Sequence, residues 1–405
     1  MRAINVVGGG VVGLACGLAL ARAGHKVTLL EADTARGAAS WGNAGHIATE
    51  QVAPLASPAA VRSAHRRLFV RGGALDLPLG RIASWLPFAL RLVGRSTPRH
   101  FAAGSAALGG LLHEAMPAWE RLVAAIDAPE LLAQEGHFVL WETPETAQAG
   151  RAAWTAADTG TARFRDADAA ELAAITGVTT APVAGAIRFS GSGQIRDLSA
   201  LAAALEAAFT RAGGRIVRER AALRIVDGMA VVPGHPADLV LVAAGIGSRA
   251  LMEATGHAAP MIAERGYHLR AAADRWPADL PPVVFEDRSM IVTRYGDCVQ
   301  AASFVELGTP DAPPDPRKWE RLEAHVRTLG LPITGPFRRW MGARPTLPDY
   351  LPAIGRSRRA GNLLYAFGHQ HLGLTLAPIT AELVAALAAG ERLAVDLAPF
   401  DLARF

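Results

Sequence analysis

The glycine turn Gly8-x-Gly10-x-x-Gly13 is the feature that most restricts how this chain can fold. Such glycines permit a tight bend, close approach of a pyrophosphate and close packing of a helix on a strand. The apolar patterns around the turn predict a strand, a helix and a second strand at residues 4–7, 11–23 and 26–30. The opening therefore predicts a Rossmann-like, nucleotide-binding unit.

Two further parts of this nucleotide site follow from the same segment. The first turn of the predicted helix, with Val11 and Val12, offers free N–H groups and a positive dipole end to a phosphate. Glu31, followed by Ala32, ends the second strand, where a carboxylate can accept hydrogen bonds from a ribose diol. This unit does not separate FAD from NAD, because both carry the same adenosine and pyrophosphate.

Length and composition favour a globular protein of two domains. The chain has 405 residues, more than one hydrophobic core usually holds, and 51% of its residues are hydrophobic. The net charge of +4 comes from arginines spread along the chain, which argues against a nucleic-acid partner. Two isolated cysteines, Cys16 and Cys298, suit a reducing cytoplasm, and no spacing of His, Cys and carboxylates predicts a metal site.

The rest of the chain predicts a mixed architecture. Residues 51–130 are helix-rich, with helical spacing over 107–126, and 310–316 reads as a loop. Strands are expected at 136–141 and 237–245, a helix at 198–212, and short alternating segments such as 290–294 and 299–304 within 264–306. The fold class is therefore α/β with an α+β second domain: a Rossmann-like domain beside a domain built on an antiparallel or mixed sheet.

Four later blocks add to the glycine turn: residues 36–46, Arg265-Gly266-Tyr267-His268, residues 340–349 and residues 368–375. In this order they resemble the D-amino acid oxidase and dehydrogenase family of FAD-dependent oxidoreductases, which includes glycine oxidase-like proteins. The pattern is most similar to that of bacterial D-amino acid dehydrogenases. The resemblance covers nearly the whole chain.

The resemblance implies FAD as the cofactor. It places FAD on a domain of residues 1–64, 192–262 and 336–405, and the substrate on a domain of residues 65–191 and 263–335. Besides the residues of the glycine turn and Glu31 with Ala32, it assigns cofactor contacts to Arg36, Ser40, Asn43, Ala44, Gly45, His46, Ala244, Gly245, Gly368, His369, His371, Leu372, Gly373, Leu374 and Thr375. The helix after Gly373 would aim N–H groups at the flavin, where they stabilise negative charge on the reduced ring.

The resemblance also implies the chemistry. Arg344 would hold the substrate carboxylate, which a guanidinium fork binds with two parallel hydrogen bonds. His371 would line the active site. The family often has a tyrosine on the strand at residues 288–292, where this chain has none, so either Tyr267 or Tyr350 would take its place or the pocket would be less polar.

The expected reaction is FAD-dependent dehydrogenation of a small carboxylate-bearing amine. A D-amino acid, or a cyclic or N-substituted amino acid such as a D-proline derivative, would give a hydride to flavin N5 and form an imino acid that hydrolyses to a 2-oxo acid. Two alternatives stay open: oxidation of a 2-hydroxy acid on the same scaffold, and a flavin-containing subunit without a substrate of its own.

The electron acceptor is open among a quinone, oxygen and a protein. The basic run Arg62 to Arg67, with residues 85–88 nearby, could form a membrane or acceptor surface. A solvated helix face followed by a core-packing segment is the favoured interpretation. The expected location is the cytoplasm, with peripheral contact at the inner face of the membrane left open.

Overall fold

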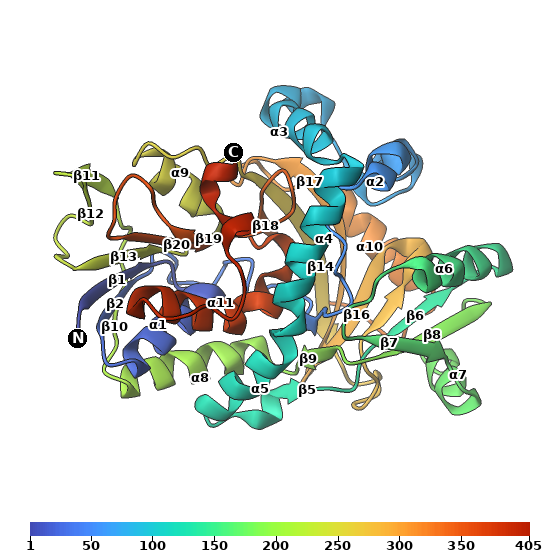
Figure 1. The fold of residues 1–405 in the computed structure, drawn as a ribbon. Coiled ribbons are helices and arrows are strands. Elements are labelled where there is room, and N and C mark those ends of the chain that lie inside the picture. The colour runs from blue at the N-terminus through green and yellow to red at the C-terminus, as the bar shows by residue number, and fades with distance from the viewer.

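The computed structural model describes residues 1–405, which form two large sheets side by side (Figure 1). The first sheet has six strands in the order β10-β2-β1-β13-β20-β19, all parallel except the edge strand β19. Its strands are β1 (Ala3–Val7), β2 (Lys26–Leu30), β10 (Arg215–Val217), β13 (Leu239–Val242), β19 (Ala353–Arg356) and β20 (Leu363–Phe367). This is the predicted Rossmann-like sheet, and β1 lies at its centre.

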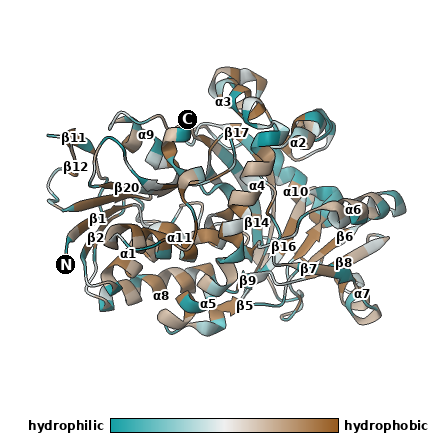
Figure 2. Ribbon diagram, in the orientation of Figure 1, coloured by the Kyte–Doolittle hydropathy of each residue, from teal (hydrophilic) through white to brown (hydrophobic).

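Both faces of the six-stranded sheet are covered. The helices α1 (Val11–Arg22), α8 (Leu198–Arg211) and α11 (Gly373–Ala389) pack on one face in a core of 51 buried residues. On the other face lie α9 (Ser248–Glu253) and the hairpin of β11 (Arg224–Val226) and β12 (Met229–Val231). The apolar residues concentrate in the strands and in α1 and α11 (Figure 2). Burial of these near-continuous apolar runs is what a parallel sheet requires.

The second large sheet is mixed, as predicted. Its order is β18-β14-β17-β16-β15-β6-β8-β7, with β4 added beside β17, and only the pairs β15–β6 and β17–β4 are parallel. Its strands are β4 (Leu75–Asp76), β6 (Phe138–Trp141), β7 (Arg163–Asp166), β8 (Gly185–Ser190), β14 (Ile262–Ala272), β15 (Val283–Phe285), β16 (Met290–Tyr295), β17 (Cys298–Gly308) and β18 (Arg338–Thr346). The helices α6 (Pro144–Ala156), α7 (Ala169–Thr176) and α10 (Pro316–Thr328) pack beside it.

A third, small sheet lies between the two large ones. It consists of β3 (His46–Ile47), β9 (Gly193–Ile195) and β5 (Leu132–Ala133). The remaining helices are α2 (Pro58–Ser63), α3 (Ile82–Arg95), α4 (Pro98–His113) and α5 (Ala115–Ala125). Of these, α2 and α3 stand at the top of the molecule in Figure 1.

Several local predictions need correction. The helical stretch expected over 107–126 is divided at Glu114 into α4 and α5. The loop expected over 310–316 ends at Pro316, where α10 begins, a helix that we did not predict. Proline is well suited to that first position, because the helix leaves its missing N–H unpaired anyway.

Two segments pack in the core of one domain although the sequence predicts them in the other. β18 follows residue 336 but pairs with β14 in the mixed sheet. α4 and α5 fall within 65–191 but pack against α11 in the core of the parallel sheet. The division of the chain into domains stays a prediction.

A buried charge cluster joins β4, β17 and α10. Lys318 is fully buried, and its Nζ lies 2.6 Å from Asp76, 2.8 Å from Glu306 and 2.9 Å from Asp315. Arg265 shares Glu306 at 2.5 Å. Buried charges are tolerated only when they are paired in this way.

One stretch, Gln370–Ala389, is long and apolar enough to cross a membrane. It includes α11, and 67% of its most apolar window is buried inside the protein. It therefore has the character of a core helix.

Candidate active site

The glycine turn has the geometry that a dinucleotide needs. Gly8 has φ +113°, and a Cβ on it would lie 2.5 Å from the carbonyl oxygen of Ala243. A Cβ on Gly13 would lie 1.9 Å from the carbonyl oxygen of Gly8, so both positions exclude any side chain. The N-terminus of α1 has no cap from its own N-cap residue, Gly10, and no acidic residue in its first turn, and Ser40 occupies only the N–H of Val11. It stays open to an anion.

Glu31 lies against this turn. Its carboxylate accepts hydrogen bonds from the N–H groups of Gly9 and Asp33. Each carboxylate oxygen has a further lone pair, so the ribose-binding role expected of Glu31 fits its position. Ser40 accepts the N–H of Val11 at 3.1 Å and thereby holds the next loop against the turn.

The loop of residues 40–46 is fastened to the mixed sheet. The carbonyl of Gly42 accepts from His268 Nδ1 at 3.1 Å. The carbonyl of Asn43 accepts from the Tyr295 hydroxyl at 2.8 Å and from Gln300 Nε2 at 3.0 Å. The loop therefore bridges the two large sheets.

A cavity of about 310 Å³ opens beside this bridge. It is lined by Ala35, Arg36, Trp41, Gly42, Leu198, Ser199, Ala202, His268, Arg270 and Trp340. Arg36 is held there by Glu206 at 2.9 Å. Of the residues expected to bind the cofactor, only Arg36 lines this cavity.

The C-terminal motif, residues 368–375, contributes mainly backbone. Gly368 has φ +78° and packs on Leu347, and the side chains of Leu372 and Leu374 are buried in the core. His369 is also turned inward, with Nε2 3.1 Å from Thr380 Oγ1, and burial lowers its pKa to about 3. A cofactor role for His369, Leu372 or Leu374 would therefore fall to the main chain.

Thr375 ties this motif to the loop after β3, because its hydroxyl accepts the N–H of Ala48 at 3.0 Å. The N-terminus of α11 has no side-chain cap and no acidic residue in its first turn. It can therefore stabilise negative charge on a ligand. Ala244 and Gly245 lie at the end of β13, where Gly245 has φ +55°.

Three cross-strand pairs on one face of β14 and β18 build the substrate side of the site: Glu264 with Arg344, Gly266 with Gly342, and His268 with Trp340. The two glycines leave room for their large neighbours. A Cβ on Gly266 would lie 2.3 Å from Arg344 Nη2, and one on Gly342 would lie 1.9 Å from the Trp340 ring. The indole of Trp340 stacks on His268 with ring centroids 4.6 Å apart.

Arg344 is pre-positioned by Glu264. Its Nη1 donates to Glu264 Oε1 at 3.1 Å and to the carbonyl of Phe304 at 3.4 Å. Neither Nε nor Nη2 has a hydrogen-bond partner within the protein, and 27% of the side chain is exposed. One edge of the guanidinium is therefore anchored and the other is available to a carboxylate.

The two candidate tyrosines have different surroundings. Tyr350 donates its hydroxyl to Glu264 Oε2 at 3.0 Å, so it belongs to the group around Arg344. Burial beside Glu264 raises the pKa of Tyr350 well above its usual value, and the hydroxyl stays neutral. Tyr267 lies on the other face of β14, bonded to Glu306 at 2.7 Å and packed on Trp319. This corrects the expectation that Tyr267 would help to hold a carboxylate.

His371 lies near the same group. Its Nε2 is hydrogen-bonded to Gln51 Oε1. Burial lowers the pKa of His371 to about 4, and the neighbouring Glu264 and Arg344 act on it in opposite directions. His371 is therefore a neutral imidazole near pH 7.

A cluster of His46, Glu50 and His137 was not predicted. His46 Nε2 lies 3.0 Å from Glu50 Oε1, and the rings of His46 and His137 meet edge-on with centroids 4.5 Å apart. Burial alone would raise the pKa of Glu50, but the two histidines lower it to about 2. Burial lowers the pKa of His137 to about 3.

This cluster is also the one group in the chain that could hold a metal ion. Its ligand atoms lie within 4.8 Å of one another, and His46 Nδ1 and Glu50 Oε2 are buried without a partner. Two histidines and a carboxylate are a set that zinc accepts. The sequence spacing gave no sign of it, because His137 is far from the other two along the chain.

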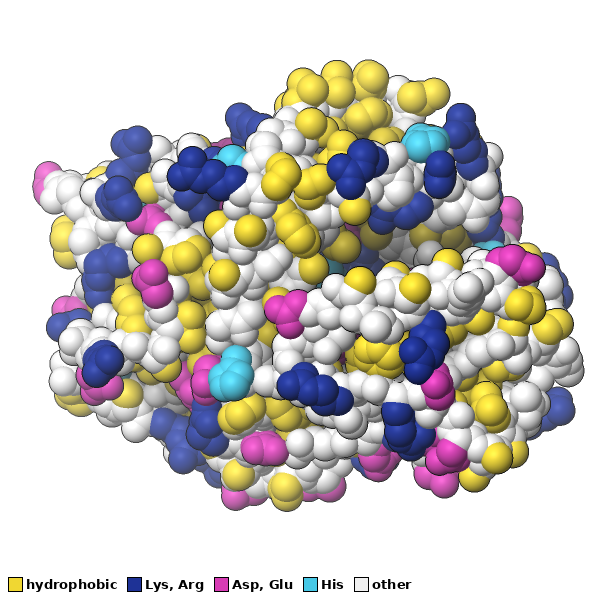
Figure 3. Space-filling view, turned by 45° about the vertical axis from the view of Figure 1, so that its right-hand side comes forward, with side chains coloured by type: hydrophobic (Ala, Val, Ile, Leu, Met, Phe, Trp, Pro, Cys, Tyr) yellow, Lys and Arg dark blue, Asp and Glu magenta, His cyan; other side chains and the backbone are white.

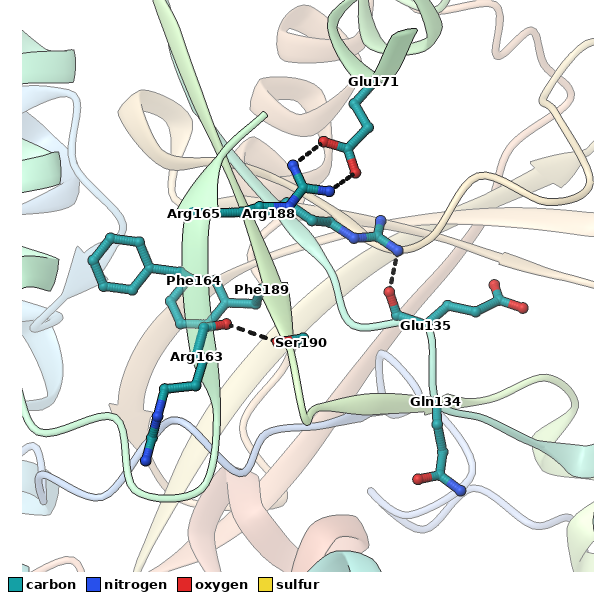
Figure 4. Close-up of a pocket in the computed structure, with 9 residues that line it drawn as sticks. All are labelled: Gln134, Glu135, Arg163, Phe164, Arg165, Glu171, Arg188, Phe189 and Ser190. Carbon is teal, nitrogen blue, oxygen red and sulfur yellow. Dashed lines mark hydrogen bonds and ion pairs between the residues drawn. The ribbon is translucent and has the colours of Figure 1, made fainter. Parts of the chain in front are cut away.

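A larger hollow of about 490 Å³ lies apart from these residues, on β7 and β8 (Figure 4). Arg165 pairs there with Glu171 through two hydrogen bonds of 2.7 and 2.8 Å, and Arg188 reaches the carbonyl of Glu135. None of the expected cofactor or substrate residues lines it.

The parallel sheet with its open glycine turn, beside a second sheet that carries the guanidinium of Arg344, defines a two-part dinucleotide-binding protein. The family model described as FAD dependent oxidoreductase matches residues 4–387. The chain therefore belongs to this family, and its cofactor is FAD. The excluded side chains at Gly8 and Gly13 and the uncapped start of α1 fit the pyrophosphate of that cofactor.

Curated relatives are similar over their whole length. The chain is 31% identical to a D-amino-acid oxidase of Bradyrhizobium diazoefficiens, over 100% of this chain and 99% of the relative. It is 28% identical to a D-amino acid dehydrogenase of Cereibacter sphaeroides, over 99% and 95%. The protein is an FAD-dependent oxidoreductase acting on amino acids.

Solved structures confirm the fold. Iminodiacetate oxidase from a Chelativorans species aligns with a TM-score of 0.72 at 18% identity, over 99% of this chain and 98% of the other. Glycine oxidase from Geobacillus kaustophilus aligns with a TM-score of 0.72 at 23% identity, over 100% of both chains.

Proposed function

We propose that this protein dehydrogenates a D-amino acid, or a cyclic or N-substituted amino acid such as a D-proline derivative. The product would be an imino acid, which water hydrolyses to a 2-oxo acid. The observation that carries this proposal is the guanidinium of Arg344. Glu264 binds its Nη1, whereas its Nε and Nη2 have no hydrogen-bond partner in the protein. The names of the curated relatives, D-amino-acid oxidase and D-amino acid dehydrogenase, support the substrate class.

The residues of the site have different roles in substrate binding. Arg344 would hold the carboxylate through its free edge, and Glu264 would fix the angle of the guanidinium. Tyr350 donates to Glu264 and stays neutral, so it adds no negative charge that would repel the substrate. The neutral His371 adds no positive charge that would repel an ammonium group. Positioning of this kind supplies a large part of such a reaction.

Bound FAD would supply the electron acceptor, by taking the hydride of the α-carbon at its N5 atom. The substrate ammonium would first lose one proton to solvent, and the lone pair of the neutral amine would then form the C=N bond as the hydride leaves. No residue here needs to act as a strong base, which is consistent with the lowered pKa of His371.

The test is anaerobic bleaching of the flavin absorbance by a panel of compounds. The panel contains D- and L-amino acids, N-methyl amino acids, prolines and 2-hydroxy acids. We expect D-amino acids or D-prolines to bleach the flavin, and their L-enantiomers and the hydroxy acids to leave it oxidised. Bleaching by hydroxy acids alone would replace the proposal with 2-hydroxy acid oxidation. A flavin that no compound bleaches would indicate a non-catalytic subunit.

A further inference from the structure

An apolar stripe runs along the outer side of α3. Ile82, Leu86, Leu90 and Val93 lie one helical turn apart and are 45%, 38%, 65% and 52% exposed. The opposite side of α3 packs into the protein, where Trp85 and Phe88 join a buried cluster with Ile262 and Leu307. The helix is therefore apolar on both sides, and only one side has a partner.

Two further large apolar side chains are exposed in the segment that leads to α3. Val70 and Leu79 are 79% and 82% exposed. Together with the four residues of α3 they make up six of the ten large apolar side chains that are exposed on the whole protein. Figure 3 shows hydrophobic side chains gathered at the top of the molecule, over α3. We call these six residues the α3 surface.

The segment that contains the α3 surface carries positive charge without counter-charge. Residues 51–113 contain one acidic residue, Asp76, and its charge is taken up by the buried Lys318. Seven arginines of this segment are exposed and none forms an ion pair: Arg62, Arg66, Arg67, Arg71, Arg81, Arg91 and Arg99. Elsewhere arginines commonly pair, as Arg121 does with Glu382.

We propose that the α3 surface docks this protein onto the surface of a lipid bilayer that contains anionic lipids. The apolar stripe would enter the head-group region, as amphipathic interfacial helices do, and the arginines would lie against lipid phosphates. A second copy of the chain is a poorer partner, because it would bring the same unpaired arginines against each other. The inference is separate from the proposed substrate, because docking does not depend on which compound is oxidised.

The docking face is continuous with the active site through β14. Ile262, which packs under α3, begins the strand that carries Glu264 two residues later. A docked bilayer would therefore lie near the end of the site that holds Arg344.

Vesicle flotation of the purified holoprotein tests the proposal. The vesicles consist of phosphatidylcholine alone or of phosphatidylcholine mixed with phosphatidylglycerol. One variant combines Leu86→Asp with Leu90→Asp, and a matched control combines Val226→Asp with Met229→Asp, two residues that are 44% and 45% exposed on β11 and β12. A charge variant combines Arg66→Glu with Arg91→Glu, and its control combines Arg220→Glu with Arg224→Glu, at two exposed arginines outside residues 51–113. Flavin absorbance and melting temperature establish that each variant is folded.

We expect the wild type and both controls to float with the phosphatidylglycerol vesicles and to be released by high salt. The Leu86→Asp with Leu90→Asp variant and the charge variant should each lose about 10-fold or more of this binding. Failure of the wild type to float, or equal flotation of the α3-surface variants, would overturn the proposal. A second result would also overturn the proposal: a wild type that binds no vesicles but forms a dimer in solution, which Leu86→Asp with Leu90→Asp dissociates. The α3 surface would then join two copies of the chain.

Discussion

Glu264 and Arg344 face each other across β14 and β18, with Arg344 Nη1 3.1 Å from Glu264 Oε1. Glu264 also accepts from Thr346 at 3.1 Å and from Tyr350 at 3.0 Å, so its own position is held from three sides. The pair therefore restrains the guanidinium as well as balancing its charge.

Replacement Glu264→Gln tests this restraint. The amide is nearly isosteric but lacks the charge, so the guanidinium should lose its fixed angle while staying available to a carboxylate. We expect kcat to fall about 10-fold and KM to change by less than about 3-fold, because orientation is lost more than affinity. Glu382→Gln, which breaks an exposed pair with Arg121, is the control. An equal loss in both variants would show that Glu264 has no positioning role.

Gly266 provides the space in which Arg344 lies. A Cβ there would be 2.3 Å from Arg344 Nη2, so Gly266→Ala should push the free edge of the guanidinium aside. We expect KM for a carboxylate substrate to rise about 10-fold with normal FAD content. Gly361→Ala is the matched control, because a Cβ at Gly361 meets no atom within 4 Å. An unchanged KM in Gly266→Ala would contradict the placement of Arg344.

Lys318 is buried in contact with three carboxylates, those of Asp76, Glu306 and Asp315, and is one of only two lysines in the chain. Its replacement by methionine keeps the apolar stem but leaves the buried Asp76 without a cation and removes one of the two cations beside Glu306. We expect Lys318→Met to lower the free energy of unfolding by about 3–5 kcal/mol. Lys26→Met, at the exposed second lysine, should have almost no effect. Equal unfolding curves for the two variants would contradict the importance of the cluster.

Buried histidines predict how stability depends on pH. Burial lowers the pKa of His137 and His369 to about 3 and that of His371 to about 4, from 6.5 in an unfolded chain. Between these values the unfolded chain binds more protons than the folded protein, so stability should fall as the pH decreases below 6.5. Each buried histidine should contribute on the order of 1 kcal/mol per pH unit in this window.

Denaturant unfolding at about pH 7.5, 6 and 5 measures this loss of stability. Over this range the histidines of the unfolded chain become protonated while the buried ones stay neutral. His137→Gln should lessen the loss, because glutamine does not titrate. The control His65→Gln replaces an exposed histidine and should keep the wild-type loss. A loss of stability in His137→Gln as large as that of the wild type and of His65→Gln would contradict the lowered pKa of His137.

Features that depend on neighbouring residues could be predicted from the sequence. The turn Gly8 to Gly13 lies between a strand and a helix that each carry a local apolar pattern, and the structure contains all three. α10 was missed because the prolines before it resemble a loop, although Asp315 followed by Pro316 is a signal for a helix start.

Features that depend on strand pairing could not be predicted. Glu264 meets Arg344 only through the register of β14 with β18, which the two segments do not specify alone. His137 likewise reaches His46 and Glu50 through the folding of a distant strand. The error at Tyr267 was avoidable, since alternation along a strand places Tyr267 on the face opposite to Glu264 and His268.

In the proposed function, the free edge of Arg344 holds the carboxylate of an amino acid substrate. Anaerobic flavin reduction by a D-amino acid, measured over a range of concentrations, gives an apparent Kd for the substrate. For Arg344→Met we predict that this Kd rises about 10- to 100-fold while FAD stays bound, and that Arg392→Met, at an exposed arginine, matches the wild type. An unchanged Kd in the FAD-loaded Arg344→Met protein would contradict the account.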